Sequence, residues 1–311
     1  MPSIKELNNK LKNYQNTKKI TSAMKLVAAS KLRRAQEAIE RTRPYRAELT
    51  GLLADLHGSL VGADIDPVVA PWLAPREIRH VSVVVFTSDK GLCGSFNNGL
   101  IRTVEKGLGL RPNDLDPEQF KEFVDLEGLI AKGVKVKVFF AGKKAYESLR
   151  SKLSGERLGE LFQGVTYKPS LAESRKISDR LIEDYLGGKT DAIYIAVNQF
   201  VSPLTQIPQL QRVFPSAPSA GKGKTKSVLF DPDAATVLSA LVPQSIRFLM
   251  LNALLENAAG EHGARMTAMD NATRNTKEMI EKTTLLRNRV RQANITKELI
   301  EIISGAESIK S

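Results

Sequence analysis

Cysteine is nearly absent from this chain of 311 residues, since Cys93 is the only one. A single thiol cannot form a disulfide within the chain, and it cannot supply a cysteine cluster for a metal ion. Long apolar runs are missing as well. The most apolar windows, Val81–Phe86 and Val134–Ala141, are far shorter than the roughly 20 apolar residues that span a bilayer. We therefore expect a protein of a reducing compartment that works outside the lipid.

Helix-breaking residues are scarce at both ends. No proline lies between Pro2 and Pro44, and none follows Pro243. Apolar residues recur in both stretches at spacings of three and four, which is typical of helices that pair with one another. Each apolar stripe is too narrow to be buried by its own helix. We therefore predict that 1–60 and 244–311 form an antiparallel coiled coil.

Acidic residues are absent from Leu7 to Gln36, whereas lysine and arginine recur throughout that stretch. In the whole chain Lys and Arg number 46 against 34 Asp and Glu, giving a formal charge of +12. Such unrelieved repulsion favours an acidic surrounding. Nucleic acid, an anionic membrane surface and an acidic protein all fit, although Tyr14 is the only aromatic residue there that could stack on bases. Charge alone leaves these alternatives open.

The middle of the chain has short β-rich runs that alternate with helical stretches. This pattern predicts an α/β domain at 78–215, Rossmann-like, with a largely parallel sheet covered by helices. The segment 216–243 has the composition of a linker loop, and an acidic insert is expected at 111–128. The predicted strands are Val81–Phe86, Val134–Phe140 and Ala192–Val197 with an edge strand at Thr205–Phe214, and the predicted helices are Asn98–Lys106, Lys143–Leu153 and Leu171–Leu186.

A glycine-containing loop, Thr87–Ser95, connects the first predicted strand to a helix. Such loops can bind phosphate through backbone N–H groups, but the residue order here is that of neither a P-loop nor a dinucleotide fingerprint. We expect a tight turn or a protein contact, with a nucleotide-using enzyme as the alternative. Cys93 needs a neighbouring base to act as a nucleophile, and His57, His80 and His262 are scattered along the chain. We therefore predict no catalytic residue, no cofactor and no metal site.

Four segments carry a family resemblance: QNTKKITSAMKLVAASKL at 15–32, SDKGLCG at 88–94, ARMTAMDNA at 264–272 and RQANITKELIEIISGA at 291–306. Together they resemble the gamma subunit of F-type, proton-translocating ATP synthases, in the family's order and over nearly the whole chain. In that family the gamma subunit is the central rotor. Its terminal helices form a shaft inside a ring of three alpha and three beta subunits, and its α/β domain sits with epsilon on the membrane ring of c subunits.

The resemblance implies a non-catalytic subunit that transmits torque between the c ring and the catalytic ring during ATP synthesis or hydrolysis. It also implies an influence on ATPase activity and proton flow. The implied partners are the alpha, beta and epsilon subunits and the c ring, and nucleic acid is not among them. Because the chain has one cysteine, the disulfide switch of chloroplast relatives cannot operate in it.

The resemblance further implies which side chains meet other subunits. Met24 and Lys25 would face the acidic C-terminal region of a beta subunit, and an apolar tip would turn in a bearing. The subunit-contact or coupling positions are Met24, Lys25, Asp89, Lys90, Cys93, Arg265, Gln292, Thr296 and Glu298, and the tip positions are Ile295, Leu299, Ile302 and Ile303. From the residues alone, the four tip positions also fit an ordinary coiled-coil core.

The beginning of the chain, Met1–Leu7, has no apolar stretch after a basic head. We therefore expect neither a secretion signal nor an import signal. Together with the resemblance, this favours a bacterial protein that is peripheral to the plasma membrane on its cytoplasmic side. A trimmed mitochondrial chain would look similar.

Overall fold

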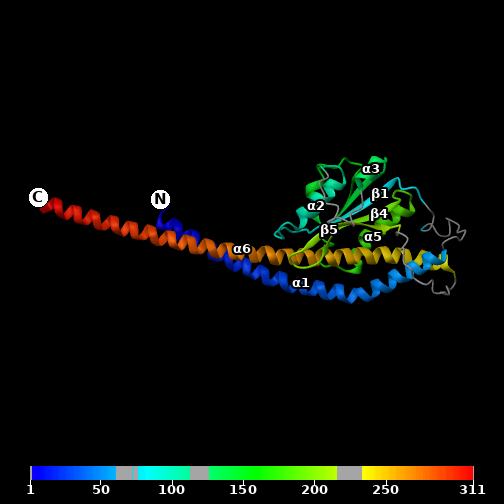
Figure 1. The fold of residues 1–311 in the computed structure, drawn as a ribbon, viewed down its shortest axis with the longest axis horizontal. Helices are drawn as coiled ribbons and strands as arrows, with labels where there is room; N and C mark the ends of the chain where they lie inside the picture. The colour runs from blue at the N-terminus through cyan, green and yellow to red at the C-terminus, as the bar shows by residue number, and fades with distance from the viewer. Residues whose placement is uncertain (1, 61–71, 73–75, 113–125, 216–232, 311) are drawn as a thin grey trace. The chain divides into compact units, whose positions relative to one another are not determined.

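The computed structural model describes residues 2–60, 72, 76–112, 126–215 and 233–310. The chain forms two compact units. We call Ser30–Ala264 the α/β unit, and we call the unit formed by Met1–Ala29 and Arg265–Ser311 the helix pair. Two long helices, α1 (Ile4–Leu60) and α6 (Ala234–Lys310), each contribute residues to both units. Figure 1 draws α1 in blue and α6 in yellow to red.

Side chains cap the N-termini of both long helices. Ser3 Oγ accepts the N–H of Glu6 at 3.2 Å, and Glu6 Oε2 accepts the N–H of Ser3 at 3.2 Å, which is a capping box. At the start of α6, Asp233 Oδ1 accepts the N–H of Thr236 at 2.8 Å. These bonds satisfy backbone donors that have no partner within the helix.

A proline lies inside α6, where the sequence led us to expect a linker. We assigned 216–243 to a linker loop by its composition and expected the helix to start after Pro243, because proline removes one helical hydrogen bond and disfavours a helix interior. The helix instead begins at Ala234 and continues through Pro243. Ile246, in the turn that follows, is fully buried in the core of the α/β unit, and such burial offsets the lost hydrogen bond. Residues 216–232 lie outside the part of the chain that the structure describes.

The α/β unit contains a five-stranded sheet with the order β3-β2-β1-β4-β5. The first four strands run parallel, and β5 pairs antiparallel with β4 at one edge. The prediction of a largely parallel sheet is therefore confirmed, whereas β3 was not predicted. The strands are β1 (His80–Phe86), β2 (Lys135–Ala141), β3 (Leu158–Phe162), β4 (Ala192–Phe200) and β5 (Gln206–Phe214).

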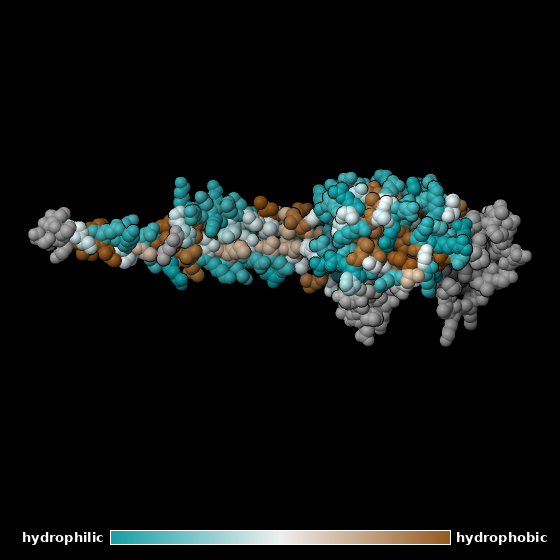
Figure 2. All heavy atoms as spheres, turned by 90° about the horizontal axis from the view of Figure 1, so that it is seen from above, coloured by the Kyte–Doolittle hydropathy of each residue, from teal (hydrophilic) through white to brown (hydrophobic). Residues whose placement is uncertain are grey.

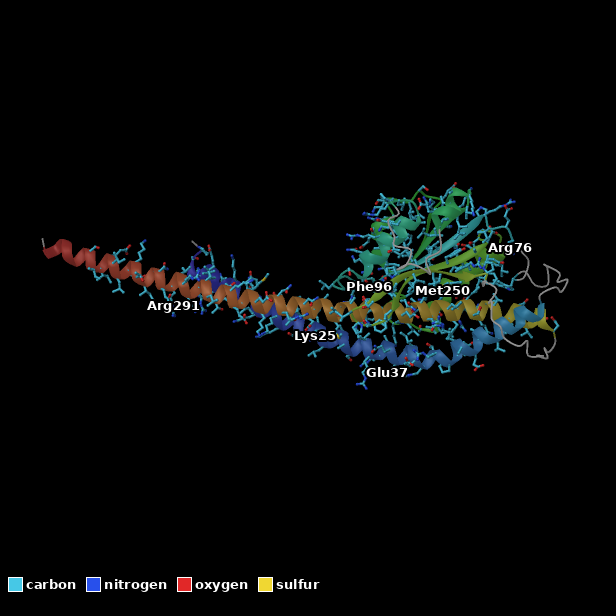
Figure 3. All side chains as sticks on the ribbon, viewed as in Figure 1. Lys25, Glu37, Arg76, Phe96, Met250 and Arg291 are labelled. Atoms are coloured by element: carbon cyan, nitrogen blue, oxygen red, sulfur yellow. The ribbon has the colours of Figure 1, made fainter. Side chains whose placement is uncertain are left out.

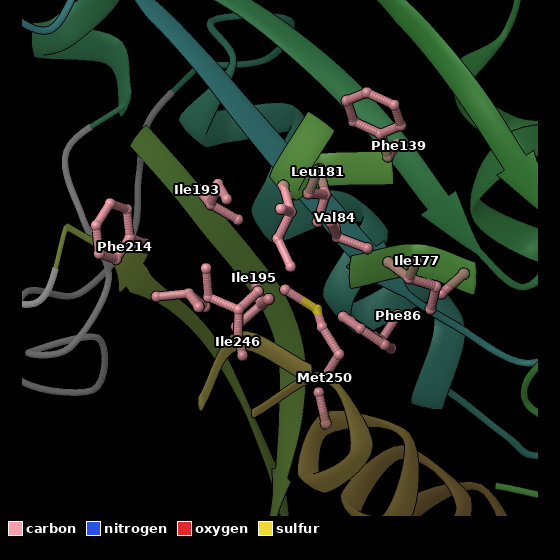
Figure 4. Packing of buried hydrophobic residues seen from close by; sticks show 14 of the residues in the cluster. Val84, Phe86, Phe139, Ile177, Leu181, Ile193, Ile195, Phe214, Ile246 and Met250 are labelled. Carbon is pink, nitrogen blue, oxygen red and sulfur yellow. The ribbon is translucent and has the colours of Figure 1, made fainter. Parts of the chain in front are cut away.

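Helices cover both faces of this sheet (Figure 1). One face packs against α5 and α6, and the other against α2, α3 and α4. Figure 4 shows the first of these layers, in which Met250 of α6 and Leu181 of α5 lie against Ile195 of β4. Because both faces are buried, the central strands are almost continuously apolar. The shorter helices are α2 (Phe96–Gly107), α3 (Leu126–Ala131), α4 (Lys143–Leu149) and α5 (Leu171–Leu186).

The only tryptophan of the chain joins this core. The Trp72 ring stacks on Tyr185 with 5.2 Å between ring centroids, and Phe214 meets it edge-on at 5.5 Å. The Arg76 guanidinium lies 4.3 Å from the centroid of the Tyr185 ring. Burial raises the pKa of the Tyr185 phenol, and the charge of Arg76 opposes that rise.

The predicted insert, 111–128, ends in α3, and its residues 113–125 lie outside the described part of the chain. Its first residue is anchored, because Arg111 and Lys152 both bond to the Glu105 carboxylate on α2. Burial raises the pKa of Glu105, but the hydrogen bonds and the charges of Lys152 and Arg111 together hold that pKa below its ordinary value. The start of the insert is therefore fixed to α2 by a buried carboxylate.

In the other unit, α1 and α6 run antiparallel, as predicted. The hydroxyl oxygens of Thr21 and Thr273 lie 2.7 Å apart, and Lys25 Nζ lies 2.6 Å from Asp270 Oδ1. One helical turn forward along α1 thus corresponds to about one turn backward along α6, which requires antiparallel helices. The buried residues of this helix pair include Leu7, Leu11, Ala28, Met269, Thr276 and Val290.

Candidate functional site

Asp89 fastens the loop that follows β1. Its Oδ1 accepts the backbone N–H of Lys143 at 3.0 Å, and its Oδ2 accepts the hydroxyl of Thr166 at 3.0 Å. The carboxylate therefore caps the N-terminus of α4 from a distant loop, where a negative charge is favourable. Asp89 was predicted as a subunit contact, and the structure gives it this role inside the unit.

The backbone donors at the start of α4 are engaged by the same loop. The N–H of Lys144 donates to Ser88 O at 3.2 Å, and the N–H of Ala145 donates to Thr87 Oγ1 at 3.1 Å. Gly142, just before the helix, has φ of 106°, and a Cβ there would lie 2.1 Å from Thr87 O. Phosphate binding at a helix N-terminus requires open N–H groups, so this geometry favours a tight turn over nucleotide binding.

Lys90, in contrast to Asp89, is exposed. Its Nζ lies 5.5 Å from the ring centroid of Tyr167, and Lys31 Nζ of α1 lies 5.2 Å from the same ring. Tyr167 is itself 69% exposed, so an aromatic ring and two ammonium groups share one surface. No sequence pattern pointed to Tyr167, because its neighbours form an irregular loop without periodicity.

Cys93 is buried, with 2% of its surface exposed. The Asn97 amide donates to Cys93 Sγ at 3.2 Å, and Ser88 Oγ lies 3.8 Å from the sulfur. Both groups are neutral, whereas a catalytic thiol requires a base or a cation that stabilises the thiolate. In the described ranges, moreover, no group of three or more His, Cys, Asp or Glu side chains is placed to hold a metal ion.

Met24, Lys25 and Arg265 lie in the unit of paired helices. Figure 3 labels Lys25 on α1, where its Nζ pairs with Asp270 and its side chain is 43% exposed. Met24 and Arg265 are half-buried. The structure thus brings these residues onto the helix pair, and Lys25 already has a partner within the chain.

The predicted tip residues lie on a part of α6 that is exposed all round. Every residue from Arg291 to Gly305 is exposed, and the coiled-coil-core reading of the tip is therefore wrong for the chain by itself. Figure 2 shows apolar side chains at the surface of this stretch. The tip residues and their exposed fractions are Ile295 50%, Leu299 53%, Ile302 68% and Ile303 61%.

The polar coupling positions of the last helix lie on the same exposed stretch. Gln292, Thr296 and Glu298 are exposed, and Thr296 Oγ1 donates to the carbonyl of Gln292 at 3.0 Å within the helix. Arg291, where the stretch begins, is labelled in Figure 3. Polar and apolar side chains are therefore both exposed on this stretch of α6, which packs against no other helix among the described residues.

A polar cavity lies in the α/β unit between α1, α6 and the end of β4. Asn252 and Glu256 of α6 line it, and Arg46 Nη1 of α1 lies 3.6 Å from Glu256 Oε1. Burial raises the pKa of Glu256, and Arg46 offsets only part of that rise. Sequence patterns could not reveal this cavity, because its lining comes from three distant segments.

Comparison with known proteins identifies the family. A family model described as ATP synthase matches residues 3–309. The ATP synthase gamma chain of Chelativorans sp. (strain BNC1) is 40% identical over 311 residues, which covers 99% of this chain and 100% of the relative. That of Paracoccus denitrificans (strain Pd 1222) is 37% identical over 310 residues with the same coverage. The chain belongs to the ATP synthase gamma chain family.

Solved structures share the fold of this gamma-chain family member. A chain of the Euglena gracilis mitochondrial ATP synthase, solved as OSCP/F1/c-ring in rotational state 3, aligns with a TM-score of 0.62 and 18% identity, covering 98% of this chain and 94% of that one. A chain of the Tetrahymena thermophila central stalk and c-ring structure aligns at 0.56 and 21%, covering 81% and 99%. None of the helices in the described ranges is both long and apolar enough to cross a bilayer.

Proposed function

We propose that this chain is the central rotor shaft of an F-type ATP synthase. The observation that carries the proposal is that α6 is one helix with three different surroundings along its length. It supplies the core of the α/β unit through Met250, it pairs with α1 through Asp270, and it then continues as an exposed helix. An element that transmits torque needs an uninterrupted connection along the chain, which a single helix provides.

The partners follow from the family and from the surfaces of the chain. The alpha and beta subunits surround the helix pair, and their acidic groups offset the positive charge of α1. The epsilon subunit and the c ring meet the α/β unit. Met24 and Lys25 face a beta subunit, Lys90 presents a charge to a neighbouring subunit, and the exposed tip turns in an apolar bearing.

Torque transmission requires an asymmetric shaft. A threefold-symmetric shaft would present the same face to every catalytic site and could not favour one state over another. Two antiparallel helices with a single continuing helix are asymmetric at every level. As the c ring turns the α/β unit, each beta site meets a different face of the shaft in sequence, and the sites therefore change state in order.

The chain itself is a non-catalytic subunit under this proposal. The engaged N–H groups of α4, and the burial of Cys93 with its sulfur accepting the Asn97 amide, support that assignment. The assembled complex is bacterial and peripheral to the plasma membrane, with this subunit on the cytoplasmic side.

Reconstitution tests the proposal. The purified chain is combined with alpha and beta subunits of a relative, and a bead is attached to the α/β unit. We expect an assembled ATPase in which ATP hydrolysis rotates the bead in one direction. An assembled, hydrolysing complex without rotation would overturn the proposal. The same α and β subunits assembled with the relative's own gamma chain provide the control.

A further inference from the structure

Two glycines of α6 allow other parts of the α/β unit to approach the helix backbone. A Cβ at Gly260 would lie 2.6 Å from Phe96 Cε2, and a Cβ at Gly263 would lie 3.0 Å from Pro203 Cα. Both positions are helical, so the backbone does not demand glycine there. Glycine destabilises a helix interior relative to alanine, and close contact is therefore the physical reason for glycine at these positions.

Phe96 fills the space that Gly260 leaves. It is the first residue of α2, it is 4% exposed, and it forms a small apolar cluster with Cys93 and Ala264. Its backbone carbonyl also accepts the Asn198 amide at 3.0 Å. Figure 3 labels Phe96 on the side of the α/β unit along which α6 runs. The ring is thus buried between Gly260 and this cluster, and the backbone that carries it is held by Asn198.

The other end of the loop is held by the same face of α6. Asn257 is fully buried, and its Nδ2 donates to Thr87 O at 3.3 Å. Positions 257, 260 and 264 are three or four residues apart and therefore lie on one side of the helix. Both ends of the loop between Thr87 and Phe96 consequently rest on a single strip of α6.

The tip of this loop is exposed although its base is buried. Leu92 is 64% exposed and has φ of 64°, which is rare for a residue other than glycine. Lys90 is exposed beside it. A strained conformation persists only where its surroundings impose it. The fixed base therefore determines where the exposed tip lies.

We propose that Phe96 and Gly260 are positioning residues, which lock the loop at 88–95 to α6 so that its exposed tip moves with the helix as one body. This inference rests on the proposed rotor function, because only a turning helix makes the stiffness of the loop important. A loosened loop yields under load, and ATP hydrolysis then moves fewer protons.

The single cysteine is a native reporter of this contact. Cys93 belongs to the same apolar cluster, so a displaced Phe96 ring exposes the thiol. We expect Gly260→Ala to speed maleimide labelling of the full chain about tenfold, because the added methyl group overpacks the contact. Adding Phe96→Leu replaces the ring by a smaller side chain and so makes room for the added methyl group. The labelling rate then returns to near that of the unmodified chain.

Gly99→Ala is the matched control. Gly99 lies in α2, one turn after Phe96, and a Cβ there meets nothing within 4 Å. It gains the same helix propensity as Gly260→Ala without a clash, so its labelling rate stays unchanged. An unchanged rate in Gly260→Ala, or a raised rate that Phe96→Leu does not reverse, overturns the contact.

The complete complex in vesicles provides the functional readout, protons moved per ATP hydrolysed. We expect Gly260→Ala to lower this ratio by about half or more, with recovery in the Gly260→Ala/Phe96→Leu chain and no change in Gly99→Ala. Faster labelling without any change in the ratio overturns the positioning role. Failure of the unmodified chain to assemble contradicts the rotor function instead, while the labelling experiment still tests the contact.

Discussion

Lys25 Nζ and Asp270 Oδ1 lie 2.6 Å apart although 245 residues separate the two side chains along the chain. This pair fixes the register of α1 against α6 at one level of the helix pair. The hydrogen bond from Lys25 lowers the pKa of Asp270, desolvation opposes the shift, and the charges of Lys25 and Arg274 add to the lowering. The folded chain thus holds this carboxylate in its charged form more strongly than the unfolded chain does.

Replacing Asp270 by asparagine should lower the melting temperature at pH 7. A carboxylate whose folded pKa is depressed stabilises the fold above its unfolded pKa of about 3.9 and loses that contribution as the pH falls through the folded value. The difference from the unmodified chain should therefore close in acid. Circular dichroism melts at several pH values measure it. A difference that is the same in acid, or that persists in a Lys25→Met background, would show that the ion pair is not its cause.

Glu256→Gln should raise the melting temperature at neutral pH. Burial raises the pKa of Glu256, so the folded state binds the proton more tightly and stability falls as the pH rises above the unfolded pKa. Glutamine removes this cost, and the gain should vanish toward pH 4. Glu37→Gln is the control, since Glu37 is an exposed partner of Arg33 on α1. A lower melting temperature for Glu256→Gln would mean that Arg46 stabilises the fold more than burial destabilises it.

Serine substitutions should separate the tip of α6 from the buried helix pair. Ile302→Ser removes an exposed side chain and should change the free energy of unfolding by no more than about 0.5 kcal/mol, while it weakens assembly with alpha and beta subunits. Val290→Ser, at a position with 7% exposure, should cost about 2 kcal/mol. Urea denaturation and a subunit pull-down measure the two effects. Normal assembly of the Ile302 variant would contradict the bearing contact.

Met24→Lys should disturb coupling more than stability. The half-buried side chain lies beside Lys25, and a further positive charge there changes the surface offered to a beta subunit without opening a buried core. Melting temperature and protons moved per ATP are compared in the same preparation. Met24→Leu, which keeps the volume nearly constant, should leave both unchanged. Equal losses of stability and coupling would place Met24 in the packed seam instead.

The sequence predicted the parts of the fold that repeat a simple pattern. The Val-rich run of β1 and the three- and four-residue spacing of α1 are strong signals, and the structure confirms them. β3 was missed because its five residues, Leu158–Phe162, contain no β-branched side chain. The start of α6 was misplaced because we took Pro243 as the boundary of the helix, from its effect on the local backbone. The burial of Ile246, which offsets that effect, depends on the whole sheet.

The candidate site was predictable only in part, for a similar reason. The motif containing Asp89 and Lys90 located the loop, but no pattern distinguishes a carboxylate that caps α4 from a lysine that faces solvent. That distinction depends on Lys143, 54 residues away. The exposure of Ile302 likewise depends on a distant residue. The antiparallel α1 begins at Ile4, and α6 extends beyond that point without a helix beside it.

Trp72 gives the α/β unit an intrinsic fluorophore that the other unit lacks, since the chain has one tryptophan and its ring stacks on Tyr185 inside the sheet core. Emission from this ring reports the melting of the sheet core alone, whereas far-ultraviolet dichroism at 222 nm is dominated by the long helices. The two signals, recorded in one denaturant titration, therefore show whether the α/β unit and the long helices unfold together or in sequence, without any label on the chain.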